Sequence, residues 1–398
     1  MQIVIYTRVF APSVGGVETL MMSLAAGLSG RETGRGGKRV EVIVLTAQAA
    51  GEFDDRGLPF RVVRQPGLWG MVQWFRRADV VHLAGPSLVP LLAGLVLRRP
   101  VIVSHHGFQA ACPNGQFFLQ PEARLCPGHF LARRHGQCLK CNTGSGRWPS
   151  VKSWLVTFPR RWMCQCTAVN VVPTSWLGTV LKLPRTAVVA HGVAESSVVP
   201  AADPAIQPKF SFVGRLVSTK GVGALLAAAK HLKAKGHSFQ LQVIGDGPER
   251  EELKANTKRA GLNGTVEFLG AVEPERIEQE LAGSMAVVVP SLAGEVFGLV
   301  AAENMMAGRA VVTSDIGALR EVSGDTGLSF PAGDAHALAE RLESLLKTPG
   351  LAARLGEQAR RRAQELFHVE RMVSEHLRLY EEAMPRAGTL RSISGEGR

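Results

Sequence analysis

The sequence predicts an α/β protein with two doubly wound parallel-sheet domains, and three observations support this fold class. The chain has 398 residues, more than one hydrophobic core usually serves. Short apolar segments rich in β-branched residues alternate with helical segments, which is typical of parallel strands buried on both faces. The alternation restarts after residue 200, so we expect a second such domain facing the first across a cleft.

Strands are predicted at regular intervals along both halves. They are residues 3–6, 40–45, 80–83, 101–104 and 168–172, then 209–213, 240–244, 266–269, 286–290 and 310–313. A segment with three prolines, 198–208, predicts a linker between domains 1–200 and 201–364. A helical run with one apolar face, 361–383, follows, and the polar residues 385–398 predict a disordered tail.

Positive charge is concentrated in the first half of the chain. Residues 1–200 hold 22 Lys and Arg against 9 Asp and Glu, whereas residues 201–398 hold 24 against 25. All six tryptophans also lie in the first half, and Trp beside Arg suits a lipid interface. Two interpretations stay open, an ordinary solvated basic surface or a face that binds an anionic membrane. Because no nucleic-acid-binding motif is present, we expect no nucleic-acid partner.

The N-terminus and one long uncharged segment bear on localisation. MQIVIYTRVF lacks a signal-peptide pattern and predicts a first strand. Residues 80–97 carry no Asp, Glu, Lys or Arg, but Pro86 and Pro90 favour a strand, a turn and a buried helix over a membrane span. We therefore expect a cytoplasmic protein, with peripheral binding to the inner face of the membrane as an open alternative.

The most informative motif is a buried strand, a glycine-containing turn and a helix within residues 287–303. Glu295 lies in the turn, and Glu303 lies in the first turn of the helix. Carboxylates there can accept hydrogen bonds from the vicinal hydroxyls of a sugar or ribose, or they can merely stabilise the helix N-terminus. Backbone N–H groups of the turn can face a phosphate. These turn residues are Phe297, Gly298, Leu299 and Val300.

Two cations follow the predicted strand 209–213. Arg215 and Lys220 come after its carboxyl end, which in a parallel sheet faces the cleft. Together they can neutralise a diphosphate leaving group without a metal ion. The alternative is a solvated pair on a surface loop.

Two glycine-containing loops also follow predicted strands. Gly15 and Gly16 come just before a helix, where they permit close approach of the backbone to a phosphate. Gly245 lies in a Gly-Asp-Gly turn before Pro248, which indicates turn geometry first and nucleotide contact second. Each loop is weak alone, because glycine occurs in many turns.

A pair of histidines, His105 and His106, follows the buried strand 101–104. A histidine at the end of a parallel strand can hydrogen-bond a sugar hydroxyl or carry a proton. The alternative, a packing or loop histidine, is expected for at least one of the two.

Together and in this order, the motifs resemble those of the family-4 retaining glycosyltransferases with the GT-B fold, the glycosyl transferases group 1. The resemblance covers most of residues 1 to about 345. Its matching pieces are Gly15-Gly16-Val17-Glu18, His106-Gly107, Gly214-Arg215-Leu216 with Lys220-Gly221, Gly245-Asp246-Gly247-Pro248, and Glu295 to Glu303. One departure is His191-Gly192, where the family often has Asn-Gly.

The resemblance implies a role for each matching residue. Arg215 and Lys220 would hold the donor diphosphate. Glu303 would bind the ribose, and Glu295 would contact the transferred sugar. The other donor-binding positions implied are Gly15, Gly16, Gly245, Phe297, Gly298, Leu299 and Val300.

The resemblance also implies a reaction. A hexose-type sugar would move from a UDP- or GDP-sugar to a glycan or lipid-linked acceptor, in cell-surface polysaccharide or glycolipid synthesis. His106 would lie by the sugar, no catalytic metal would be required, and the leaving phosphate would take the acceptor's proton. The last helix, 365–384, would cross back to the first domain. The alternatives are an inactive or regulatory sugar-nucleotide-binding homologue, or another GT-B enzyme such as an epimerase.

A cysteine-bearing insertion is predicted at residues 108–165. The separation of Cys138 and Cys141 is a zinc half-site spacing, and Cys112 and Cys126 could complete a four-thiolate structural site. Reduced free thiols and a disulfide or redox site are the alternatives. The resemblance implies that such an insertion forms an acceptor-side lid.

Overall fold

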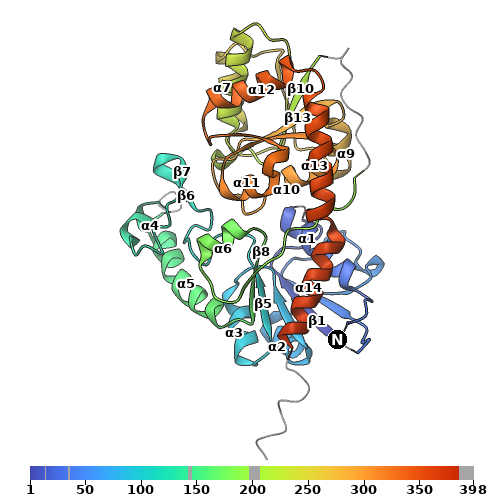
Figure 1. Cartoon of the computed structure of the whole chain (residues 1–398). Helices are drawn as coiled ribbons and strands as arrows, with labels where there is room; N and C mark the ends of the chain where they lie inside the picture. Colours follow the sequence, from blue (N-terminus) through green and yellow to red (C-terminus); the bar gives the residue numbers. More distant parts are fainter. Residues whose placement is uncertain (14, 35, 142–145, 197–206, 385–398) are drawn as a thin grey trace, which may run out of the picture.

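The computed structural model describes residues 1–13, 15–34, 36–141, 146–196 and 207–384, which form two α/β domains (Figure 1). The N-terminal sheet has the strand order β3-β2-β1-β4-β5-β8-β9, and the C-terminal sheet has the order β12-β11-β10-β13-β14-β15. The first strand of each sheet pairs in parallel with both neighbours. Both sheets are therefore doubly wound about their first strand, and the predicted fold class is confirmed.

The N-terminal domain and its insertion contain strands of two to six residues. They are β1 (Gln2–Thr7), β2 (Glu41–Thr46), β3 (Arg61–Arg64), β4 (Val80–Leu83), β5 (Val101–Ser104), β6 (Phe118–Leu119), β7 (Arg124–Leu125), β8 (Val169–Val172) and β9 (Thr186–Val188). The helices are α1 (Gly16–Leu28), α2 (Gly67–Arg77), α3 (Leu88–Val96), α4 (His135–Cys141), α5 (Arg147–Cys166) and α6 (Ser175–Leu181).

The C-terminal domain repeats the alternation of strand and helix. Its strands are β10 (Lys209–Val213), β11 (Gln240–Ile244), β12 (Val266–Gly270), β13 (Ser284–Val289), β14 (Ala310–Ser314) and β15 (Leu328–Phe330). Its helices are α7 (Val222–Ala234), α8 (Arg250–Arg259), α9 (Pro274–Glu280), α10 (Leu299–Met306), α11 (Gly317–Ser323), α12 (Ala335–Lys347) and α13 (Leu351–Phe367), and α14 (Val369–Ala383) ends the described chain.

The central strand β1 is buried on both faces, as its uninterrupted apolar sequence predicts. Val4 packs into one core layer beneath α2, α3 and α5, whereas Ile3 and Ile5 pack into the opposite layer with α1 and α14. All three side chains are fully buried. Successive residues of a strand point to opposite faces, so both faces must be apolar when helices cover both.

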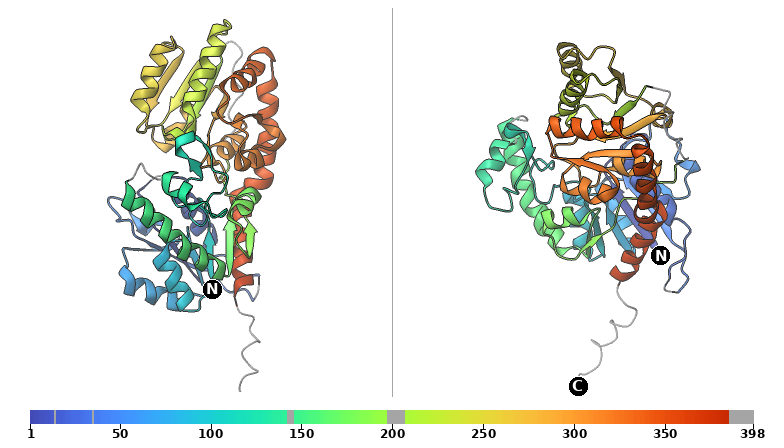
Figure 2. Two further views of the ribbon diagram at one scale, coloured as in Figure 1. Left: turned by 90° about the vertical axis from the view of Figure 1, so that its left-hand side faces the viewer. Right: turned by 45° about the horizontal axis from the view of Figure 1, so that its top comes forward.

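The final helical run consists of two helices, not the single one predicted over 361–383. His368 interrupts it with extended backbone, and its side chain caps α14 by accepting a hydrogen bond from the Glu370 backbone N–H. Helix α14 then runs along the N-terminal domain (Figure 2). A Cβ atom on Gly27 of α1 would lie 2.6 Å from Val373, so the two helices touch closely. The C-terminal helix therefore completes the core of the first domain.

The outcomes of the remaining predictions from the sequence differ from one another. Residues 80–97 form β4, a turn and α3. Among the described residues, no helix is both long enough and apolar enough to cross a bilayer. The short edge strands β3, β9 and β15 were not predicted. Most of the predicted linker and the whole predicted tail lie outside the described residues.

Candidate active site

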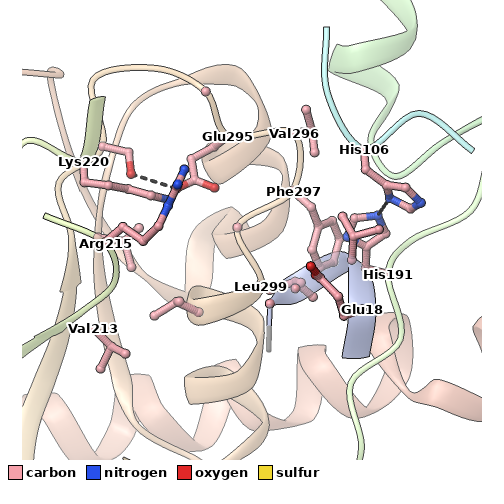
Figure 3. Close-up of a pocket in the computed structure, with 18 of the residues that line it drawn as sticks. Glu18, His106, His191, Val213, Arg215, Lys220, Glu295, Val296, Phe297 and Leu299 are labelled. Carbon is pink, nitrogen blue, oxygen red and sulfur yellow. Dashed lines mark hydrogen bonds and ion pairs between the residues drawn. The ribbon is translucent and has the colours of Figure 1, made fainter. Parts of the chain in front are cut away.

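A cavity of about 480 Å³ lies between the domains, at the carboxyl ends of both sheets (Figure 3). The loops after β1, β5 and β9 form one wall, and the loops after β10 and β13 form the other. Most predicted site residues line it, namely Gly15, Gly16, His106, Arg215, Lys220, Glu295, Phe297, Gly298, Leu299 and Val300. Gly245 and Glu303 are not part of the lining.

Arg215 and Lys220 give the C-terminal wall its positive charge (Figure 3). The Lys220 Nζ donates a hydrogen bond of 2.5 Å to Oε1 of Glu295, and the Ser291 hydroxyl donates to the same oxygen at 2.8 Å. Among the described residues Arg215 makes no ion pair. An unpaired guanidinium at a cleft attracts an anion, and its planar fork suits phosphate oxygens.

Gly221 brings this cationic loop against the end of β13. Its φ is +68°, in the region that favours glycine, and a Cβ atom there would lie 2.0 Å from the carbonyl oxygen of Pro290. The Leu292 backbone N–H also donates to the Thr219 carbonyl at 2.7 Å. Glycine is therefore required for the two loops to form one surface.

The N-terminus of α10 opens into the same cavity. Gly298 precedes the helix with φ +99°, and no side chain caps it. The first N–H groups of a helix have no acceptor within it, and the helix dipole places partial positive charge there. Because Leu299 and Val300 line the cavity, their N–H groups are placed for an anion.

The opposite wall comes from the N-terminal domain. A Cβ atom on Gly16 would lie 2.7 Å from Cδ1 of Leu299, so the start of α1 touches the start of α10 across the domain boundary. Glu18, in the first turn of α1, also lines the cavity and points towards it (Figure 3). Absence of a side chain at Gly16 thus allows the close approach of the two helix starts.

His106 and His191 form a pair on the side of the cavity opposite Arg215 and Lys220 (Figure 3). Nδ1 of His106 lies 3.2 Å from Nε2 of His191, and the His191 ring also packs on Phe297. Burial lowers the pKa of His106 to about 3, with a further contribution from His105, and burial lowers the pKa of His191 well below its usual value. Both rings are therefore neutral at physiological pH, and only one of the two facing nitrogens carries a proton.

A small second cavity lies behind this pair. Histidines from three segments of the chain line it: His105 and His106 after β5, His191 after β9, and His376 of α14. Each has a ring nitrogen with no hydrogen-bond partner in the described structure. The cavity connects the candidate site to α14, which contributes His376.

Glu303 and Gly245 lie near the cavity but outside its lining. Glu303 is reached by water, yet crowded protein atoms desolvate its carboxyl group and raise its pKa to about 7, with a further contribution from Glu278. A Cβ atom on Gly245 would lie 1.9 Å from the carbonyl oxygen of Gly214, so this glycine keeps two strand ends in contact. Gly245 thus allows a close contact between two backbone segments, and its contact with a nucleotide stays a prediction.

Four of the five cysteines of the insertion gather in one region. Cys112, Cys126, Cys138 and Cys141 are all buried, and none forms a disulfide. Burial raises the pKa of the Cys138 thiol to about 12, and the other three cysteines add to this electrostatically. In the part of the chain that the structure describes, no three His, Cys, Asp or Glu side chains are arranged to hold a metal ion.

Some cavity residues were not predicted from the sequence. They are Glu18, His191, Ser291 and Gly294, among others. Glu18 ends the Gly-Gly motif, and His191 belongs to the His-Gly pair before the linker. A local sequence motif could therefore have indicated both as site residues. Ser291 and Gly294 carry no signal that distinguishes them from other turn residues.

Comparison with known proteins agrees with this geometry. Residues 201–362 match the sequence model of the family "Glycosyl transferases group 1". The phosphatidyl-myo-inositol mannosyltransferase of Mycolicibacterium smegmatis is 37% identical over 36% of this chain and 37% of its own length. The 2-deoxystreptamine N-acetyl-D-glucosaminyltransferase of Streptomyces fradiae is 28% identical over 82% of this chain and 81% of its own length.

The solved structure of Anabaena HepE in complex with UDP superposes with a TM-score of 0.70 at 18% identity, over 96% of this chain and 100% of that one. Strong sequence identity is thus confined to about two fifths of the first curated relative, whereas similarity of fold extends over nearly the whole chain. The chain therefore contains, at residues 201–362, a segment similar to the group 1 glycosyltransferases, and its two facing parallel sheets have the GT-B fold.

Proposed function

We propose that the protein transfers a hexose-type sugar from a nucleotide-sugar donor to an acceptor hydroxyl, with retention of the anomeric configuration. The observation that carries this proposal is that Arg215, Lys220 and the uncapped N-terminus of α10 line one cavity. All three suit a diphosphate, whose negative charge grows as the sugar leaves. His106 and Gly16 face them from the other domain.

The donor lies with its diphosphate against Arg215, Lys220 and the backbone N–H groups of Leu299 and Val300. Two cations and a helix N-terminus neutralise the leaving group without a metal ion. Glu303, just beyond the cavity lining, accepts hydrogen bonds from the ribose hydroxyls.

Glu295 binds the transferred sugar rather than attacking it. Its Oε1 already accepts hydrogen bonds from Lys220 and Ser291, which stabilise the carboxylate and lower its nucleophilicity. The acceptor hydroxyl attacks on the face that the diphosphate leaves, and a phosphate oxygen takes its proton. His106 hydrogen-bonds a sugar hydroxyl and orients the ring.

The donor is a UDP- or GDP-sugar. A complex of the structurally similar HepE with UDP supports uridine, and the mannosyltransferase and glucosaminyltransferase relatives support a hexose. A donor present well above its Kd should stabilise the protein by about 2–4 kcal/mol.

Calorimetric titration with UDP, GDP and their hexose conjugates tests this assignment. We expect one nucleotide class to bind, and Arg215→Ala to weaken binding at least about tenfold because it removes a charge-assisted hydrogen bond. Arg320→Ala, on an exposed arginine of α11, serves as the control for a lost surface charge. Failure of every nucleotide to bind the folded protein would overturn the proposal.

The acceptor is a glycan or lipid-linked molecule presented at a membrane surface. Exposed apolar side chains gather on α2, α3 and α5, including Trp69 at 80%, Trp148 at 84% and Trp162 at 64% exposure. Arg76 and Arg77 lie on the same α2. Aromatic rings beside arginines suit an anionic lipid surface.

Co-sedimentation with vesicles tests this membrane contact. We expect binding to anionic vesicles at low salt, little binding to neutral vesicles, and a severalfold loss in Trp69→Ala. Equal binding to neutral and anionic vesicles would remove the electrostatic part of the proposal.

The cysteine cluster is a candidate structural zinc site only if its thiols rearrange, because no three of the described side chains are arranged to hold a metal ion. Burial and neighbouring thiols raise the pKa of Cys112, Cys138 and Cys141, so zinc would have to displace their protons. Metal analysis of protein purified without chelators decides this. One zinc per chain, lost in Cys138→Ser, supports the site, and metal-free folded protein favours reduced thiols.

A further inference from the structure

A third cavity, of about 340 Å³, adjoins the proposed donor site on the N-terminal side. Val17, Glu18 and His106 line both cavities, so the two meet where sugar transfer would occur. The remaining lining comes from the loops after β1, β4 and β5 and from α5. Its size suits a group as large as a substituted monosaccharide.

Two arginines, Arg8 and Arg160, also line this cavity. Neither lines the donor cavity, which has its own cations. Across the described residues, neither forms an ion pair with a carboxylate. With two arginines and one carboxylate, Glu18, on its lining, the cavity keeps an excess of positive charge.

Arg160 is held in a fixed position. Its Nε donates to the carbonyl of Pro86 at 3.1 Å, and its Nη1 donates to the carbonyl of Gln109 at 3.4 Å. Burial lowers the pKa of this guanidinium. Its Nη2 has no acceptor among the described residues and can donate to a ligand oxygen.

We propose that this cavity is the acceptor site and that the acceptor carries an anionic group, a phosphate or carboxylate, bound by Arg8 and Arg160. The inference rests on the proposed function and names its acceptor class. Glu18, at the end shared with the donor cavity, accepts a hydrogen bond from an acceptor hydroxyl. The acceptor therefore has a polyol end near His106 and an anionic end near Arg160.

The source of the anion is either a soluble sugar phosphate or a phosphorylated lipid headgroup. Both offer a phosphate beside hydroxyls, which is the chemistry that the two arginines and Glu18 match. The insertion that supplies α5 thus selects the acceptor through Arg160.

Glucose 6-phosphate, glucose and glucosamine are suitable probes, because they share one ring and differ in charge. Calorimetry with each probe should show glucose 6-phosphate binding at least about tenfold more tightly than the other two. Arg8→Gln and Arg160→Gln should abolish this preference. Arg56→Gln is the matched control, because the Arg56 side chain is 91% exposed and paired with Asp54.

Two further arms separate the alternatives. Arg160→Lys keeps the charge and should retain part of the preference, and Arg8→Gln changes an exposed residue, so it tests the site without a risk to folding. If vesicles containing phosphatidylglycerol compete with glucose 6-phosphate, the anion belongs to a lipid, and if they do not, it belongs to a soluble acceptor.

Nucleotide affinity, measured on the same variants, should stay unchanged, which distinguishes this inference from the proposed function. Equal affinity for all three sugars, or a phosphate preference that survives both Gln variants, would overturn the anionic acceptor while leaving donor binding intact. Loss of nucleotide binding in wild-type protein would instead overturn the donor assignment.

Discussion

Nδ1 of His106 lies 3.2 Å from Nε2 of His191, and this contact links the proposed reaction centre to the segment that leaves the N-terminal domain. Both rings are neutral, so only one of the two facing nitrogens carries a proton. The partner therefore sets the tautomer of His106, and with it whether Nε2 donates or accepts a hydrogen bond.

Replacement of His191 should reveal this dependence. His191→Phe keeps a ring of similar shape but removes the hydrogen bond, and we expect kcat to fall about tenfold to a hundredfold. His191→Asn offers both a donor and an acceptor and should retain most of the activity. Steady-state kinetics on both variants measures the effect, and nucleotide affinity is the control for folding. Equal kcat values for the Asn and Phe variants would contradict a role of His191 in setting the tautomer of His106.

Acid should destabilise the protein through its buried histidines. Burial lowers the pKa of His105 and His376 to about 4 and that of His106 to about 3. Between pH 6.5 and about 4 the unfolded chain binds more protons than the folded chain, so stability falls as pH falls. Each histidine contributes up to about 1.4 kcal/mol per pH unit. Melting temperatures measured from pH 7 to 5 should fall less steeply in His376→Gln.

The sequence contained most of the fold because the central strands are long, apolar and bounded by glycine. β3 was missed because its apolar pair, Val62 and Val63, stands between two arginines at a sheet edge, where only one neighbour strand pairs. The break at His368 was missed because apolar periodicity continues through it, and only the tertiary contact with Val193 defines it.

The candidate site was predictable where one loop carries its own signal. The turn from Glu295 to Val300 and the cations after β10 are local patterns of this kind. Glu18 and His191 join the cavity only because the two domains meet, and that contact depends on long-range packing that no local pattern records.

The pH dependence of nucleotide binding should report on Glu303. Because desolvation by crowded protein atoms and the charge of Glu278 raise its pKa to about 7, the carboxyl is about half protonated at neutral pH. Ribose hydroxyls donate to the ionised form, so affinity should rise severalfold from pH 6 to 8. Glu303→Gln should bind more weakly at pH 8 and show a flat profile. An equal rise in the variant would place the titrating group elsewhere, such as on the nucleotide phosphate.

Gly221 and Gly236 both have positive φ, so substitutions at these two positions distinguish the cost of backbone strain from an effect on the site. Gly221 would place a Cβ atom 2.0 Å from Pro290, whereas Gly236 has open space around its Cβ position. We expect Gly236→Ala to cost about 1 kcal/mol of stability with unchanged nucleotide affinity. Gly221→Ala should cost more and weaken nucleotide binding at least about tenfold, because the cationic loop must shift. Calorimetry and chemical denaturation on the pair give both quantities.

Glu321 joins the domains on the far side of the cavity. Its carboxylate, on α11, accepts hydrogen bonds from the backbone N–H groups of Ser175 and Trp176 at 2.7 and 2.9 Å, and so caps α6 of the other domain. Carboxylates at a helix N-terminus are favoured by the dipole as well as by the hydrogen bonds. Glu321 contacts none of the residues that line the cavity in these hydrogen bonds. The contact therefore affects how the two cavity walls meet, and not which side chains they present.

Glu321→Ala should therefore favour separation of the domains. We expect unchanged nucleotide affinity, since that wall belongs to one domain, but a severalfold lower kcat, since His106 and Gly16 must approach from the other. Small-angle scattering should show a larger radius of gyration. Glu357→Ala, which removes an exposed carboxylate from α13, is the control and should leave both quantities unchanged. A variant with full activity and an unchanged radius would show that packing of Trp176 against Gly317, rather than the Glu321 cap, keeps the walls together.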